Sequence, residues 1–166
     1  MAADQNGTIP GMGENGAGMD MDHVQLLVKA QYTKDFSFEN PRAPQSLMEL
    51  EDEPDVDVNV NVEAALIGGS DFEVVLKITI NAKHKGNALF ISELEYAGVF
   101  EIGDGIPDEH KQPLLLIECP RILFPFARNI LADAIRDGGF PPLMLQPLDF
   151  GALYQQEVMK QGAGNA

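Results

Sequence analysis

The sequence predicts an α+β domain in which a four-stranded antiparallel sheet, with a Greek-key-type connection, is covered on one face by C-terminal helices. Two observations predict this fold. Four segments between residues 24 and 101 alternate apolar and polar side chains at the period of two that is typical of strands. Residues 120–137 instead carry an apolar stripe at helical period. At 166 residues the chain is long enough to bury the core of one such domain.

The first predicted strand spans residues 24–39, and its second half alternates aromatic and polar side chains. This pattern predicts one face of rings and an opposite face that carries carboxylates. The predicted rings are Tyr32, Phe36 and Phe38, and the polar residues between them are Thr33, Asp35, Ser37 and Glu39. Residues 40–54, with three prolines and an acidic cluster, predict a connection without regular structure.

Three further strands are predicted at residues 55–67, 72–82 and 88–101. The first of them alternates valine with aspartate or asparagine, which is typical of an antiparallel sheet with one solvated face. Short turns join the three strands into a meander, and the long connection permits the first strand to complete a Greek-key order. On the last strand we expect Phe90, Leu94 and Tyr96 on one face and Ile91, Glu93 and Glu95 on the other.

Two helices are predicted after the strands. The first carries its apolar stripe at Leu123, Ala127, Ile130, Leu131 and Ala134. Pro125 should kink this helix or mark its start, and residues 108–118 are expected to add a helical turn before it. The helix should end at Gly138-Gly139, and the prolines of residues 140–147 predict an extended arm. Asp149 can then cap a second helix that places Phe150, Leu153, Tyr154 and Val158 on one face.

Composition indicates where the domain begins and ends and which classes of partner suit the chain. Residues 1–22 predict a disordered arm, residues 23–160 one domain and residues 161–166 a flexible tail. With 11 Lys and Arg against 26 Asp and Glu, the net charge of −15 argues against nucleic acid and favours a basic partner. The chain carries neither a transmembrane-length apolar run nor a secretion signal pattern, so we expect a cytoplasmic protein without direct membrane insertion.

No catalytic or metal-binding constellation is recognisable. His23, His84 and His110 lack metal-ligand spacing to one another, and Cys119 is the only cysteine. Neither a nucleophile motif nor a phosphate-binding loop is present. The sequence therefore predicts a protein that is not an enzyme and needs no cofactor or metal.

Two surfaces remain open to two interpretations each. Asp35, Glu39 and Glu93, with Ile91 among them, form either the ordinary solvated face of a sheet or an acidic docking face for a basic partner. The apolar residues of the connection either tuck onto the core or line a partly exposed apolar surface; these residues are Leu47, Met48 and Leu50.

Three separated motifs resemble the bacterial protein-export chaperone family SecB. The first is Tyr32-Thr33-Lys34-Asp35, with Ser37-Phe38-Glu39 and Pro41 beyond it. The second is Cys119-Pro120-x-Ile122-Leu123-Phe124-Pro125-x-Ala127-Arg128. The third is Gly139-Phe140-Pro141, followed by Leu145-x-Pro147, Asp149-Phe150 and Ala152-Leu153. The resemblance spans residues 24–157, and it departs in the glycine-rich N-terminal arm, at residues 103–112 and in the short tail.

The resemblance implies an ATP-independent holdase that assembles as a homotetramer, a dimer of dimers. Such proteins keep secretory precursors unfolded in the cytoplasm and deliver them to the SecA motor. The family's SecA-docking positions correspond to Asp35, Glu39, Ile91 and Glu93. Its client groove corresponds loosely to Leu47, Met48, Leu143, Met144, Leu153 and Tyr154. A SecB-like chaperone that serves a toxin–antitoxin pair is the alternative.

Overall fold

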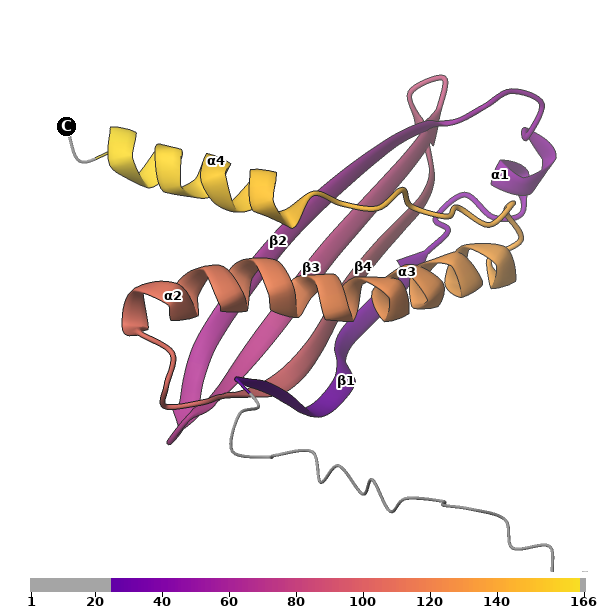
Figure 1. Ribbon diagram of the computed structural model, residues 1–166. Coiled ribbons are helices and arrows are strands. Elements are labelled where there is room, and N and C mark those ends of the chain that lie inside the picture. The colour runs from indigo at the N-terminus through magenta and orange to yellow at the C-terminus, as the bar shows by residue number, and fades with distance from the viewer. Residues whose placement is uncertain (1–24, 165–166) are drawn as a thin grey trace, which may run out of the picture.

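The computed structural model describes residues 25–164, and its central element is a four-stranded antiparallel sheet (Figure 1). The strands are β1 (Leu26–Glu39), β2 (Asp55–Gly68), β3 (Asp71–His84) and β4 (Asn87–Ile102). Their spatial order is β1-β4-β3-β2, so β2, β3 and β4 form a meander and β1 lies beside β4. This order confirms the predicted fold class. The predicted N-terminal arm of residues 1–22 lies outside the described residues, and so does His23.

The turn between β3 and β4 requires backbone conformations that few residues adopt. Lys85 and Gly86 both have positive φ angles, of 50° and 80°. A two-residue hairpin of this kind matches the twist of the strands that it joins, and glycine adopts its second position without strain. The turn thereby sets the register in which His84 pairs with Asn87.

A β-bulge on β1 changes which side chains share a face of the sheet. The register shifts between Thr33 and Asp35, so that Tyr32 lies opposite Ala97 whereas Phe36 lies opposite Leu94. The extra residue reverses the alternation at this point. The expectation that Tyr32 shares a face with Phe36 and Phe38 is therefore wrong. Tyr32 lies on the outer face, which is turned away from the helices, together with the carboxylates of β1.

One continuous helical rod crosses the inner face of the sheet (Figure 1). It consists of α2 (Asp108–Pro113), the π-helical segment η2 (Leu114–Glu118) and α3 (Cys119–Asp137). The helix is therefore longer at its start than predicted, and Pro125 lies inside α3 rather than at its beginning. Pro125 is exposed, so water can replace the backbone hydrogen bond that its ring eliminates.

The hydrophobic core lies between this rod and the inner faces of β3 and β4. Leu123, Ala127 and Leu131 are fully buried as predicted. Ile135 is fully buried too, whereas Ile130 and Ala134 are only half-buried, so the buried stripe is rotated slightly from the predicted one. The strands contribute fully buried aliphatic side chains to the same core, namely Val74, Leu76, Ile78, Ile80 and Leu94.

The remaining segments lie at the periphery. Gly139, with a φ of 94°, follows the end of α3, and an extended arm then leads to α4 (Phe150–Ala163). Asp149 caps α4 as predicted, because its carboxylate accepts a hydrogen bond of 3.0 Å from the backbone N–H of Ala152. The connection after β1 contains one short helix, α1 (Gln45–Met48), where no regular structure was expected. A hydrogen bond of 2.6 Å from Ser46 to the Asn40 side chain stabilises this turn.

Candidate functional site

The outer face of the sheet brings together the four predicted docking residues. Glu39 lies directly opposite Ile91, and Glu93 lies opposite Ser37, between Glu39 and Asp35 along the neighbouring strand. Asp35, Glu39 and Glu93 are exposed, and Ile91 is half-buried among them. We call these four residues the acidic patch. Its arrangement is three carboxylates around one apolar side chain.

The row of residues through Ile91 continues across the whole sheet. Ile91 pairs with Asn81 on β3, and Asn81 pairs with Asp57 on β2. The polar surface next to the acidic patch therefore ends in a further carboxylate on the far edge strand. Asp57 was not predicted as a site residue. The signal was present, because the alternation of β2 already placed Asp57 on the face opposite the valines.

The other half of the outer face is held together by ion pairs. The ammonium of Lys29 lies 2.8 Å from both the Asp71 and the Glu101 carboxylates. Lys34 contacts Glu73 at 2.7 Å. In the middle of the sheet, Lys77 contacts Glu63 at 3.1 Å and Glu95 at 3.2 Å. We call these three lysines and their five carboxylates the paired region.

The acidic patch has no such neutralisation within the described part of the chain. None of the ion pairs among residues 25–164 involves Asp35, Glu39 or Glu93. The two halves of the outer face thus carry similar carboxylates, but only those of the paired region lie beside a lysine ammonium. Unneutralised charges on an exposed surface attract a partner of opposite charge, whereas neutralised ones do not.

Two side chains of the outer face, Glu73 and Tyr32, have shifted pKa values. The hydrogen bond from Lys34, together with that from Tyr32, holds the pKa of Glu73 below its ordinary value. Burial and the neighbouring Glu73 carboxylate raise the pKa of Tyr32 to about 12. Tyr32 is therefore a neutral hydrogen-bond donor to an ionised carboxylate over the physiological range.

On the helical side, Leu153 and Tyr154 of α4 line a groove against β2. The groove has a volume of about 640 Å³. Its opposite wall consists of the inward-facing valines of β2, Val58, Val60 and Val62, and Leu148 also lines it. The valines were predicted to share a face but were not named as site residues. They are only partly covered because β2 is an edge strand, which a sequence pattern does not reveal.

The other four predicted groove residues do not line this groove. Leu47 packs against Gly139, since a Cβ built there would lie 3.0 Å from a Leu47 methyl carbon. Leu143 is half-buried against the core, whereas Met48 and Met144 are 80% and 57% exposed. The apolar residues of the connection after β1 were predicted either to pack on the core or to line an exposed surface, and each interpretation holds for part of them. Leu50 packs on the core, whereas Met48 faces solvent.

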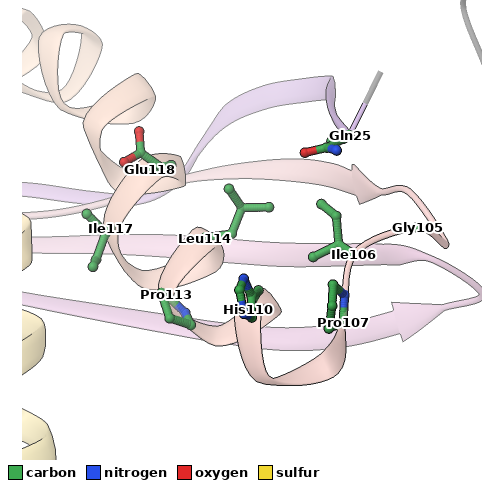
Figure 2. A pocket seen from close by; sticks show the side chains of 9 residues that line it. All are labelled: Gln25, Gly105, Ile106, Pro107, His110, Pro113, Leu114, Ile117 and Glu118. Atoms are coloured by element: carbon green, nitrogen blue, oxygen red, sulfur yellow. The ribbon is translucent and has the colours of Figure 1, made fainter. Parts of the chain in front are cut away.

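A second hollow lies where β1 begins, on the other side of the helical rod (Figure 2). Its volume is about 400 Å³, and its lining comes from the start of β1, the loop after β4, and α2 with η2. Ile106, Leu114 and Ile117 form its apolar part, and His110 and Glu118 its polar part. None of the predicted site residues lines it.

The described residues offer little for catalysis or metal binding. Among residues 25–164, no cluster of three His, Cys, Asp or Glu side chains is arranged to hold a metal ion. The Cys119 thiol is fully buried, and burial raises its pKa to about 12. None of the helices formed by these residues is long and apolar enough to cross a membrane.

Comparison with known proteins finds close relatives over most of the chain. The sequence model of one family, described as preprotein translocase subunit SecB, matches residues 20–161. A protein from Nitrobacter winogradskyi named protein-export protein SecB is 55% identical over 139 residues, which are 84% of this chain and 87% of that protein. A protein of the same name from Xanthobacter autotrophicus is 54% identical over 149 residues, 90% of this chain and 95% of its own.

One solved structure shares the fold. It is a SecB-like chaperone from Mycobacterium tuberculosis, in complex with a peptide from the HigA1 antitoxin. The TM-score is 0.63 at 16% sequence identity, and the match covers 75% of this chain and 91% of that one. At this identity the similarity describes the arrangement of the sheet and helices alone.

Proposed function

The chain belongs to the SecB family of protein-export chaperones, and we propose that it acts as a tetrameric, ATP-independent holdase in the cytoplasm. In this proposal it keeps secretory precursors unfolded and delivers them to the SecA motor. The observation that carries the proposal is the separation of two surfaces. One is the acidic patch on the outer face, which has no cation partner among residues 25–164, and the other is a groove on the helical side with a partly open row of valines. A carrier that binds a client and a motor at once needs two such surfaces.

The groove between α4 and β2 suits extended apolar segments of unfolded chains. Its apolar lining comes from the valines of β2 and from Leu153 and Tyr154. Its polar lining consists of Asn59, Asn61, Gln156, Glu157 and Lys160. The apolar part of this lining makes few directional contacts, so it discriminates poorly between sequences. Low selectivity is what a chaperone with many clients requires.

The acidic patch suits a short basic peptide with one apolar anchor. Asp35 and Glu39 are four residues apart on one strand and therefore stand about 13 Å from each other. Glu93 lies between them on the next strand, and Ile91 provides the apolar contact. We propose that this patch binds SecA, as the resemblance to the family implies.

Assembly as a dimer of dimers would bury apolar surface that one protomer leaves open. Phe126 on α3 is 51% exposed, and Val28 and Phe36 on the edge strand β1 are each 38% exposed. Apolar area of this kind on a helix and a strand edge is typical of surfaces between subunits. Sedimentation at micromolar concentration should give a tetramer, and a monomer would contradict this part of the proposal.

The client surface can be tested by removing the apolar wall of α4. Leu153→Ser combined with Tyr154→Ser should weaken binding of an unfolded secretory precursor about tenfold or more, because two large apolar contacts are lost. Val158→Ser is the matched control, since Val158 is exposed on the same helix and does not line the groove. Unchanged client affinity in a folded double variant would show that the groove is elsewhere.

The toxin–antitoxin alternative is not favoured. The relatives that are 49–55% identical all carry the name protein-export protein SecB. The chaperone that carries an antitoxin peptide is only 16% identical to this chain.

A further inference from the structure

The buried side chains of residues 25–164 include one that can carry a positive charge, His84 at the end of β3. His84 is 9% exposed, and its Nε2 atom is enclosed by protein without a hydrogen-bond partner among these residues. An enclosed polar nitrogen without a partner destabilises a fold, so native proteins retain few of them. The position of His84 therefore calls for a physical reason.

The connection after β1 (residues 40–54) lies against His84. Two segments line a hollow of about 390 Å³ between them: Met48, Glu49 and Glu51 of the connection, and His84, Lys85 and Asn87 of the β3–β4 hairpin. The Asp52 carboxylate lies 3.7 Å from His84 Nε2, and the Asp52 side chain is 69% exposed. This distance is too long for a hydrogen bond, but a displacement of Asp52 by less than about 1 Å would form one.

The connection is anchored in its first part but not at its end. Arg42 pairs with Glu49 at 2.8 Å, and Leu50 packs against the core. Residues 51–54, which lead into β2, are all exposed. Within the described chain, the only ion pair that reaches residues 51–54 is the one between Asp52 and His84. How firmly this end of the connection is held therefore depends on the charge of His84.

We propose that His84 is a proton-dependent latch, which fastens residues 51–54 to the β3–β4 hairpin when its imidazole is protonated. Histidine changes charge between about pH 5 and pH 8. The proton comes from solvent, and the imidazolium then donates a hydrogen bond from Nε2 to the Asp52 carboxylate. This contact satisfies the enclosed nitrogen and neutralises its charge. A neutral imidazole attracts the carboxylate much less, so at higher pH the segment is released.

The charges that surround His84 are suited to such a latch. Three carboxylates face it from the connection, those of Glu49, Glu51 and Asp52. The charged neighbours beyond them stand in opposite pairs, namely Arg42 with Glu49 and Lys83 with Asp55. Lys85 in the turn repels an imidazolium, but it is exposed, so solvent screens its charge. The unpaired charge that the connection presents to His84 is therefore negative.

Hydrogen exchange of the full-length protein tests the proposal, with Asp52→Asn as the variant. Because Asp52 is exposed, this change removes the charge and leaves the core intact. At about pH 5.5, the backbone amides of residues 51–53 should exchange about threefold more slowly in the wild type than in the variant. At about pH 8 the two proteins should exchange alike. Rates are compared at equal pH and corrected for the intrinsic rate of each sequence. His84→Gln should remove the slower exchange at acidic pH, because an amide does not take up the proton.

Glu109 and His110 provide the matched control. Their side chains approach to 3.9 Å, but they are 81% and 69% exposed, so solvent screens the pair. Glu109→Gln should therefore leave the exchange of residues 108–112 unchanged at both pH values.

Equal exchange of the wild type and Asp52→Asn at acidic pH would overturn the inference. A difference of the same size at both pH values would also overturn it, because the contact would then be independent of the proton. A pH-dependent effect of Glu109→Gln as large as that of Asp52→Asn would show a general charge effect and no latch. None of these outcomes depends on client or SecA binding.

Discussion

The acidic patch and the paired region lie on the same face of the same sheet but differ in how their carboxylates are neutralised. Lys29, Lys34 and Lys77 neutralise the carboxylates of the paired region at distances of 2.7 to 3.2 Å. Within the described residues, Asp35, Glu39 and Glu93 have no such partners. Alternation along a strand therefore identifies which carboxylates point outward, but not whether they form ion pairs within the sheet or remain available to a basic partner. The role depends on which cations lie on the neighbouring strands.

The same comparison explains why the two regions should respond differently to mutation. A carboxylate in an ion pair contributes to the stability of the sheet, and its loss leaves a lysine without its partner. An unneutralised carboxylate contributes little to stability, and its loss removes attraction for a basic partner.

The largest effect should come from the acidic patch. Asp35→Asn combined with Glu93→Gln should reduce SecA binding by about tenfold or more, since two of three attractive charges are lost. Client binding and the tetramer should be unchanged. Titration of labelled protein with SecA measures the effect. The matched control is Asp71→Asn with Glu101→Gln, which removes the same charge from the paired region and should leave SecA binding intact.

If both double variants weaken SecA binding equally, the effect reflects net charge, and the distinction between the two regions fails. If neither weakens it, the acidic patch is ordinary solvated surface, which is the other interpretation that the sequence left open.

The second prediction concerns the effect of salt on SecA binding and on the stability of the fold. SecA binding should weaken several-fold between about 0.05 and 0.5 M salt, because exposed charges are screened over a few ångströms at the higher concentration. The free energy of unfolding should change much less over this range, because most of it comes from the buried core. Binding that is insensitive to salt would contradict an electrostatic docking surface.

Glu73→Ala should lower the free energy of unfolding by about 1 kcal/mol, because Lys34 and Tyr32 both lose their partner. Glu93→Ala should change it by much less, since no described cation pairs with Glu93. Urea denaturation of the two variants measures the difference. An equal loss of stability in both would show that the ion pairs of the paired region are not stabilising.

The smallest effect concerns the ionisation of Tyr32. Its pKa is raised from 10.0 to about 12, so the stability that neutral Tyr32 provides is present below pH 10 and lost as the pH rises through about 12. Ultraviolet titration of the wild type should show one phenolate forming near pH 12 that the Tyr32→Phe variant lacks. A Tyr32 that ionises near pH 10 would contradict its burial beside Glu73.

The sequence predicted the elements well and their contacts less well. Alternation located the strands, and the cap at Asp149 and the glycines at 138–139 located the helix ends, because these signals are local. The outward direction of Glu93 and Ile91 was also predicted correctly. Tyr32 was assigned to the wrong face, because the bulge beside Lys34 arises from pairing with β4 and leaves no mark in the sequence.

The predictions for the two candidate binding surfaces also differ in how well the structure matches them. The structure brings the four predicted docking residues together on one face, whereas it distributes the six predicted client residues over α1, the arm and α4. Residues such as Leu47 and Met48 are adjacent and similarly apolar, yet one packs on Gly139 and the other faces solvent. That outcome depends on where the arm passes, which is a contact between segments about 90 residues apart.

By itself, the sequence determined the α+β class, the antiparallel meander and the outward charges. It also determined the membership of a chaperone family. Periodicity and motifs are local features, so they can be recognised without the tertiary structure. Only the tertiary structure decided that Asp35 meets no cation among residues 25–164, whereas Glu73 contacts Lys34 and Tyr32, and that β2 leaves its valines partly open beside α4. The physical reason is that neutralisation and burial are properties of neighbours in space. Those neighbours come from strand register and edge position, which no single stretch of residues contains.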